Sequence, residues 1–135
     1  MAVNWSDAVR NAVLDAWETA MGTSAKIQVY TGSKPANCAA SATGTKLLEY
    51  SLGSNWATDA ASAQKTLASL PLETTGLADG NAGYYRFVNS AGSTCHEQGT
   101  VTATGGGGDM TIDNIAIATS QVVRITGYTK TAPHA

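Results

Sequence analysis

The sequence is poor in charged residues and has no excess of basic ones. Charged residues make up 13% of its 135 residues, against about 25% in an average soluble domain, and the formal net charge is −2. A nucleic-acid-binding surface needs clustered Lys and Arg, so this balance argues against that function. With 43% hydrophobic residues and so small a net charge, the chain also lacks the composition of a disordered protein.

Long apolar runs are also missing. No run approaches the roughly 18 residues that a membrane-spanning helix needs, so we expect no membrane association. The opening residues, MAVNWSDAVRN, have neither a basic start nor a continuous apolar run, so we expect no signal peptide. The length fits one domain, 1–135. Within it we expect an N-terminal arm and helix at 1–22, a β-sandwich at 26–130 and a C-terminal tail at 131–135.

The few Cys and His residues do not have the spacing of a metal site. Cys38 and Cys95 lie far apart in the sequence, and so do His96 and His134, so no zinc-ligand motif is present. One disulfide and two reduced, buried thiols both remain compatible with the two cysteines. Adjacent residues of a strand point to opposite faces, which argues against a catalytic pair of Cys95 and His96.

Motifs that would hold a cofactor or carry out catalysis are absent as well. The acidic residues are scattered, and the spacing of a calcium-binding loop is missing. The run Gly105, Gly106, Gly107 and Gly108 lacks the Lys and Ser or Thr of a phosphate-binding loop. Such a run favours an unusual backbone path or a flexible tip that orders on contact. We therefore expect no enzyme activity, no cofactor and no metal.

What the sequence does contain is small, uncharged side chains. Nearly half of the residues are Ala, Gly, Ser or Thr. A free monomer usually keeps about a quarter to a third of its surface charged. The composition therefore fits either a small domain with Thr-rich strands or a protein that buries part of its surface against copies of itself or a partner.

One segment predicts a helix. Ser6 is a suitable N-cap, Asp7 places a negative charge in the first turn, and Gly22 is a suitable stop. Apolar residues recur between them at spacings of three and four, at Val9, Ala12, Val13, Ala16, Trp17, Ala20 and Met21. We expect this face to pack on a sheet through Val9, Val13 and Trp17. The alternative is a clamp that docks on a neighbouring molecule through Trp5 or Trp17.

After the helix the pattern changes to the alternation that is typical of strands. The expected strands are 26–31, 46–52, 65–72, 84–88, 94–102, 109–114 and 121–129, with 115–118 as a short strand or a connection. Pro71 should shorten the third of them or move it to an edge. On the 94–102 strand, Cys95, Glu97, Gly99 and Val101 should share one face. One helix followed by short, regularly spaced strands predicts a mainly β fold, either a sandwich or a barrel. Of the two we expect an antiparallel β-sandwich.

Some residues are candidates for contacts with a partner. Trp56 falls in an expected loop, where it is either a lid on the core or a binding platform. The full set of candidate partner-contact residues is Trp5, Trp17, Trp56, Gly105, Gly106, Gly107 and Gly108.

Three segments together resemble small proteins of tailed double-stranded-DNA bacteriophages. They are VRNAVLDAWETAMG (9–22), KIQVYTGSKPANCAA (26–40) and STCHEQGTVTATGGGGDMTIDN (93–114). Some relatives resemble capsid decoration, or cement, proteins on the outside of an HK97-type shell. The resemblance implies a jelly-roll-like sandwich and no catalytic residue. It also implies binding to the major capsid protein, location on the virion surface after synthesis in the host cytoplasm, and a role in stabilising the expanded shell.

Two further expectations accompany that resemblance. Closed symmetry favours a homo-oligomer, as a dimer or trimer. The alternative function is a module on a tail or fibre that recognises host glycans through exposed aromatic residues such as Trp56, Tyr84 or Tyr128.

Overall fold

The computed structural model describes residues 3–134 and is mainly β, with one helix, as the sequence predicts. The helix is α1 (Asp7–Met21). The strands are β1 (Lys26–Thr31), β2 (Lys46–Ser51), β3 (Gln64–Thr66), β4 (Leu72–Thr75), β5 (Gly80–Val88), β6 (Cys95–Ala103), β7 (Met110–Ile112), β8 (Ala116–Ile117) and β9 (Val122–Thr131).

The ends of α1 lie where the sequence places them. Ser6 Oγ accepts a hydrogen bond from the backbone N–H of Val9 at 3.3 Å, and Asp7 occupies the first turn. Gly22 has a φ of 86°, a left-handed conformation that glycine adopts without the steric cost that a Cβ adds. Its N–H donates to the carbonyls of Glu18 and Thr19.

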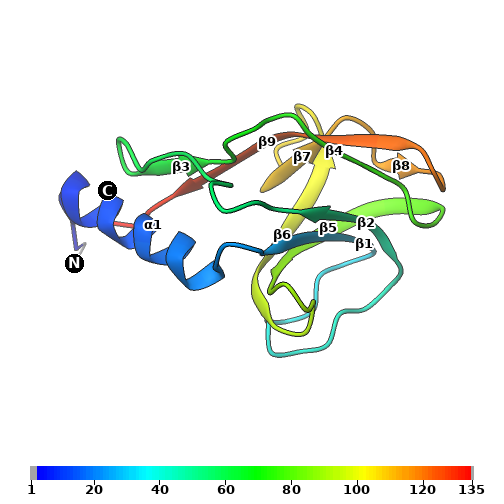
Figure 1. The fold of residues 1–135 in the computed structure, drawn as a ribbon, viewed down its shortest axis with the longest axis horizontal. Coiled ribbons are helices and arrows are strands. Elements are labelled where there is room, and N and C mark those ends of the chain that lie inside the picture. The colour runs from blue at the N-terminus through cyan, green and yellow to red at the C-terminus, as the bar shows by residue number, and fades with distance from the viewer. Residues whose placement is uncertain (1–2, 135) are drawn as a thin grey trace.

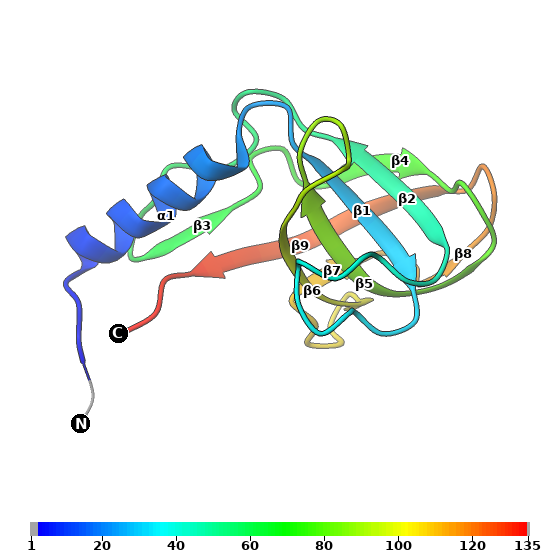
Figure 2. The same cartoon turned by 90° about the horizontal axis from the view of Figure 1, so that it is seen from below.

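The strands form one curled sheet (Figure 2) in the order β2-β1-β5-β6-β7-β9-β3, with β4 paired to β9 and β8 paired to β5. All pairs are antiparallel except β6 and β7, which are parallel. The expectation of an antiparallel arrangement is therefore wrong at this pair. The chain leaves β6 and turns back twice through 104–109 before it enters β7. The left-handed φ angles of Gly105 and Gly107, 86° and 81°, permit that path.

Two expected boundaries are also wrong. The segment 65–72 holds parts of two strands, because the chain turns at Leu70 and Pro71 and so places β3 and β4 at different positions along β9. The 84–88 strand begins earlier, at Gly80, in a segment expected to be a loop. Its first two residues pair with β8, and a Cβ on Gly83 would lie 1.9 Å from the carbonyl oxygen of Gly32. Tertiary pairing here outweighs weak strand propensity.

The core lies inside the curl of the sheet. Its fully buried side chains include Ile27, Val29, Leu47, Leu48, Phe87, Met110, Ile112, Val123 and Ile125. Trp56 is 5% exposed and packs against this cluster, and its indole N–H donates to the carbonyl of Gly22 at 3.0 Å. Trp56 is thus a lid on the core, and its expected role as a partner contact is wrong because the side chain is buried.

A bulge in β6 changes which residues share a face. Glu97 pairs with Phe87 while Cys95 pairs with Val88, so one residue of β5 spans two residues of β6. Neighbouring residues of β5 point to opposite faces, and Cys95 therefore lies on the opposite face from Glu97. The expectation that these two side chains share a face is wrong. Cys95 instead forms a disulfide with Cys38, with a Cα–Cα distance of 5.2 Å.

Candidate functional site

A narrow arm extends from the body of the sheet (Figures 1 and 2). It consists of α1, β3 and the end of β9, and the residues at both ends of the described chain lie at its tip. There the backbone N–H of Trp5 donates to the carbonyl of His134 at 2.8 Å, and the rings of the two side chains meet edge to face. Trp5 is therefore half-buried against the C-terminal tail.

The inner face of α1 is fixed to the arm mainly by polar contacts. Leu14, Ala63 and Ala132 form a small buried cluster. Arg10, 8% exposed, donates to the carbonyls of Ala132 at 2.7 Å and Pro133 at 3.1 Å. These bonds run between segments at opposite ends of the sequence, so they hold the arm in one geometry.

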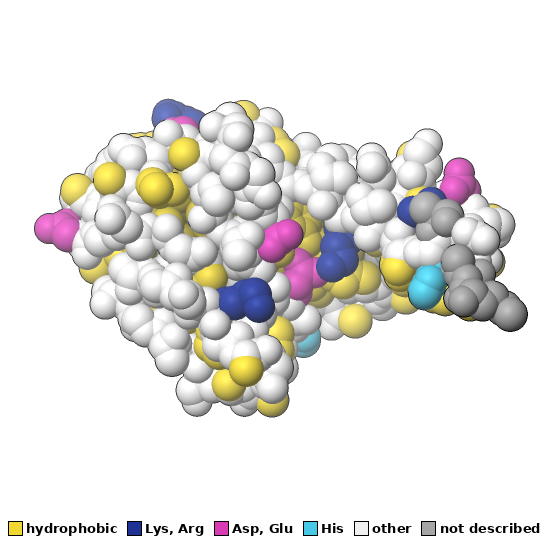
Figure 3. Space-filling view, turned by 180° about the vertical axis from the view of Figure 1, so that it is seen from behind, with side chains coloured by type: hydrophobic (Ala, Val, Ile, Leu, Met, Phe, Trp, Pro, Cys, Tyr) yellow, Lys and Arg dark blue, Asp and Glu magenta, His cyan; other side chains and the backbone are white. Residues whose placement is uncertain are grey.

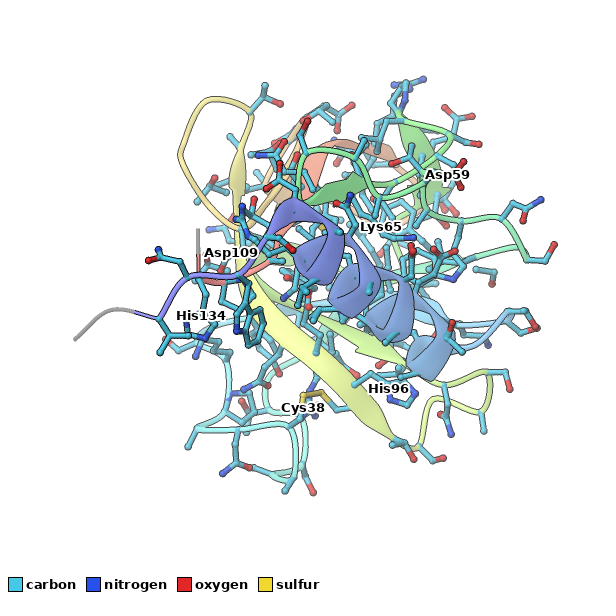
Figure 4. The ribbon with its side chains drawn as sticks, turned by 90° about the vertical axis from the view of Figure 1, so that its left-hand side faces the viewer. Cys38, Asp59, Lys65, His96, Asp109 and His134 are labelled. Atoms are coloured by element: carbon cyan, nitrogen blue, oxygen red, sulfur yellow. A yellow bond between two sulfur atoms is a disulfide. The ribbon has the colours of Figure 1, made fainter. Side chains whose placement is uncertain are left out.

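A buried lysine makes a second polar contact under the helix. The Lys65 side chain is 3% exposed and forms ion pairs with Glu18 and with Asp15, the latter at 2.9 Å. Figure 4 shows Lys65 beside α1. Burial lowers the pKa of Lys65, but its bonds to the two carboxylates outweigh that effect, and the pKa is raised overall. The charged form of Lys65 is therefore the one that the arm stabilises.

The outer face of α1 is apolar and exposed. Val9 is 48% exposed and Val13 is 37% exposed. The expectation that both pack on the sheet is wrong, because the buried residues of α1 are Arg10, Leu14 and Met21. The exposed face continues along the helix through small residues, at Ala12, Ala16 and Ala20. We call the five residues Val9, Ala12, Val13, Ala16 and Ala20 the outer stripe.

The helix thus has two apolar stripes rather than one. At about 100° per residue, the outer stripe and the buried inner face are centred roughly 120° apart. The residues of the inner face pack on β3 and β9. These two strands are too narrow to cover the inner face and the outer stripe together. What remains uncovered is a helix face of valine and alanine side chains, which is a candidate contact with another protein.

Trp17 lies where the arm joins the body, with contacts inside the molecule. Its ring packs on Trp56, Phe87 and Tyr128, with centroids 5.3, 6.1 and 6.3 Å away. Its indole N–H donates to Glu97 at 3.1 Å. Of the two expected roles, packing on the sheet is therefore the one that the structure shows for Trp17.

The Gly105–Gly108 tip lies in the body and is tied by hydrogen bonds. The N–H of Gly108 donates to Thr102 Oγ1 at 2.9 Å. The Asp109 carboxylate accepts from the N–H and hydroxyl of Thr100, at 2.9 and 3.0 Å. Gly105, Gly106 and Gly107 are exposed, so this tip stays a predicted contact.

Glu97 stands at the back of a hollow of about 530 Å³ between body and arm. Its carboxylate accepts from Trp17 Nε1, Tyr85 OH, Tyr128 OH and Lys130 Nζ, at 3.1, 2.8, 2.5 and 2.8 Å. Figure 3 shows acidic and basic side chains gathered at this junction. All four donors already occupy the Glu97 carboxylate, so it has little capacity left to accept a proton from a substrate as a general base. The arrangement is better suited to connecting the arm to the body.

The two tyrosines of this hollow stay protonated over a wide pH range. Burial raises the pKa of Tyr85, and the nearby Glu97 carboxylate raises it further. Burial likewise raises the pKa of Tyr128, with contributions from Tyr85 and Glu97. Each hydroxyl therefore remains a hydrogen-bond donor to Glu97.

The histidines and the acidic residues labelled in Figure 4 do not form a cluster. Figure 4 shows His96, Asp59 and Asp109 well apart, with His134 beside the first turn of α1. Within residues 3–134, no three Cys, His, Asp or Glu side chains come together as ligands for a metal ion. Within the same residues, no helix has both the length and the apolar character needed to cross a membrane.

Sequence reasoning missed the polar residues that shape the molecule. The helix pattern puts Arg10 on the polar side, yet it is buried, and the strand pattern predicts Glu97 only as one member of a face. Both lie in ordinary sequence contexts, and their importance comes from partners far along the chain. The comparisons with known proteins add no further guide, since no family model, curated protein or solved structure matches the chain.

Proposed function

We propose that this protein is a structural virion protein that binds the outside of an HK97-type capsid and stabilises its expanded shell. The resemblance to phage decoration proteins suggests this role. One structural observation supports it: a firmly bonded, projecting arm that presents the exposed apolar outer stripe. In this proposal the outer stripe contacts the major capsid protein. The jelly-roll-like sandwich and a dimeric or trimeric state belong to the same proposal.

Such a protein acts by thermodynamic linkage. A ligand that binds only the expanded shell stabilises that state by its binding free energy. Many copies on one lattice add their contributions, and an oligomer that bridges neighbouring capsomers gains avidity. A rigid arm suits this task because little conformational entropy is lost when it docks.

The test is sedimentation of the purified protein with expanded capsids that have been stripped of it. The proposal predicts saturable co-pelleting at hundreds of copies per shell. A double variant, Val9→Asp with Val13→Asp, should abolish co-pelleting because it places two charges on the outer stripe. Leu77→Asp is the matched control, since Leu77 is an equally exposed apolar residue, 53% exposed, on the body.

Two results would overturn the proposal. One is co-pelleting that the outer-stripe variant leaves unchanged, which would remove the arm from the contact. The other is no binding to shells together with a few copies of the protein on purified tails. That second result would favour the tail or fibre alternative. The aromatic residues expected to bind glycans in that alternative are buried: Trp56, Tyr84 and Tyr128 are 5%, 0% and 4% exposed.

A further inference from the structure

Arg86 lies on the outer face of the sheet, in β5, and is 5% exposed. It lines a cavity of about 260 Å³ between the sheet and the loop that carries Cys38. Other walls of the cavity are formed by Gln28, Tyr30, Ala42 and Ser93. This site is separate from the arm and from the Glu97 hollow.

The charge of Arg86 is incompletely compensated. Its Nη2 donates to the carbonyl oxygens of Cys38 and Ala40, at 3.0 and 2.7 Å. Its Nε is closed off from solvent and has no hydrogen-bond partner in the described part of the chain, and the same is true of Oε1 of Gln98, which pairs with Arg86 across β5 and β6. No carboxylate within residues 3–134 forms an ion pair with this guanidinium. A buried cation with neutral partners alone is costly, and an anion that reaches it gains correspondingly.

The surroundings of the cavity do not supply that anion. No acidic residue of the described chain lines the cavity. Gln28, which does line it, donates to Glu49, and that carboxylate also pairs with Lys26 and Lys46; the three distances are 2.8, 3.5 and 3.1 Å. Together with Arg86, these lysines leave the local balance of charge positive.

The wall over Arg86 is held firmly. The Cys38–Cys95 disulfide ties the loop to β6. Tyr84 adds a second tie, since its hydroxyl donates to the carbonyl of Thr43 at 2.6 Å and accepts from the Thr43 N–H at 2.9 Å. The cavity is thus formed before any ligand arrives, which lowers the entropic cost of binding.

We propose that the Arg86 cavity binds a carboxylate group. A planar guanidinium matches the geometry of a carboxylate. A carboxylate needs fewer free donors than a phosphate does, and both hydrogen bonds that Arg86 Nη2 donates already go to the carbonyl oxygens of Cys38 and Ala40. The carboxylate belongs to a small free acid or to an acidic side chain or chain end of a partner. This inference does not depend on the proposed capsid role.

Nuclear magnetic resonance of the Arg86 Nε–Hε group in the full chain tests the proposal. Titration with sodium acetate should shift this resonance saturably, whereas sodium chloride at equal ionic strength should not. N-acetylglycine represents a chain end, and acetyl-aspartate amide represents an acidic side chain. Tighter binding of one of these than of acetate identifies the source of the carboxylate, and equal binding points to a small free acid.

Variants at the cavity mouth keep Arg86 and the fold in place. Ala42 lines the cavity and is exposed, so Ala42→Phe should obstruct entry and weaken acetate binding about tenfold or more. Ala36→Phe is the matched control, because Ala36 is exposed in the same loop but does not line the cavity.

Four results would overturn the inference. They are an Arg86 resonance that acetate does not shift saturably, an equal shift with chloride, binding of inorganic phosphate as tight as that of acetate, and undiminished acetate binding by the Ala42→Phe variant. If acetate does not shift the Arg86 resonance, and Hε shows a strong cross-peak to water, a water molecule bridges Arg86 Nε and the buried Oε1 of Gln98.

Discussion

The body and the arm are held together by different forces. In the body, aromatic and aliphatic side chains fill the curl of the sheet, and Phe87 lies within 6.1 Å of Trp17, Trp56, Tyr85 and Tyr128, centroid to centroid. The arm has only the small cluster around Leu14 and relies on the bonds of Arg10 and Lys65.

This difference concerns both stability and function. Apolar burial stabilises the body in proportion to area, at roughly 25 cal/mol per Å². A few directional bonds fix the shape of the arm but bury little area. We therefore expect the arm, although its folded geometry is fixed by these bonds, to unfold locally at a lower free energy than the body.

The largest expected effect is in the body. Phe87→Ala should lower the free energy of unfolding by about 3–5 kcal/mol, because it empties the centre of the aromatic cluster. Urea unfolding followed by tryptophan fluorescence measures this loss. Leu77→Ala, at an exposed position, should stay within about 0.5 kcal/mol of the wild type. Similar losses in the two variants would contradict the division into core and surface.

The next effect concerns the apolar contact of the arm. Leu14→Ala should cost about 2–4 kcal/mol locally, and hydrogen exchange should accelerate in α1 and β3 before it does in β5. Val13→Ala, one position along the helix, is the control and should leave exchange in α1 nearly unchanged. Equal acceleration throughout the body would show that arm and body unfold as one unit.

A smaller effect depends on pH. Lys65→Met should cost about 1–3 kcal/mol at neutral pH, because Glu18 and Asp15 lose their buried partner. The raised pKa of Lys65 stabilises the folded state fully below the ordinary lysine pKa, about 10.4, and this contribution is lost as the pH rises through the folded-state value.

The measurement for this prediction is urea unfolding of wild type and Lys65→Met at a series of alkaline pH values. The difference in unfolding free energy between the two proteins should shrink above about pH 10.5. Ionisation of the buried tyrosines at alkaline pH destabilises both proteins equally, so it cancels in this difference. Lys34→Met, at an exposed position, should show no such difference at any pH. A constant difference for Lys65→Met would contradict the charge-dependent role of this residue.

The smallest expected change in stability is at the outer stripe. Val9→Asp with Val13→Asp should change the free energy of unfolding by less than about 1 kcal/mol, because both side chains are exposed and neither contacts the core. Thermal unfolding measures this change, and the same variant is the one expected to lose binding to capsids. A large loss of stability would mean that this face is needed for folding.

Sequence patterns predicted local structure best where local chemistry decides it. Ser6 and Gly22 set the ends of α1 through capping, and the bounds expected for the first strand, 26–31, are those of β1. The turn between β5 and β6 also lies between the expected strands 84–88 and 94–102. Each of these features depends on residues close together in the chain.

Predictions failed where distant partners decide. The apolar positions of α1 span about half of its circumference, and periodicity alone cannot tell which part the narrow end of the sheet covers. The bulge that turns Cys95 away from Glu97 arises from pairing with β5, and only that pairing brings Cys95 to Cys38. The Arg86 cavity could not be predicted because its walls come from four separate segments of the chain.

Local sequence patterns suffice to predict a mainly β chain with one capped N-terminal helix, because strand alternation and helix capping act over a few residues. Three features depend on the folded chain: the sheet curls with a parallel pair, Trp56 is buried, and Val9 and Val13 face outward. Burial depends on which surfaces meet across the whole chain, whereas a local pattern shows only that a surface is apolar.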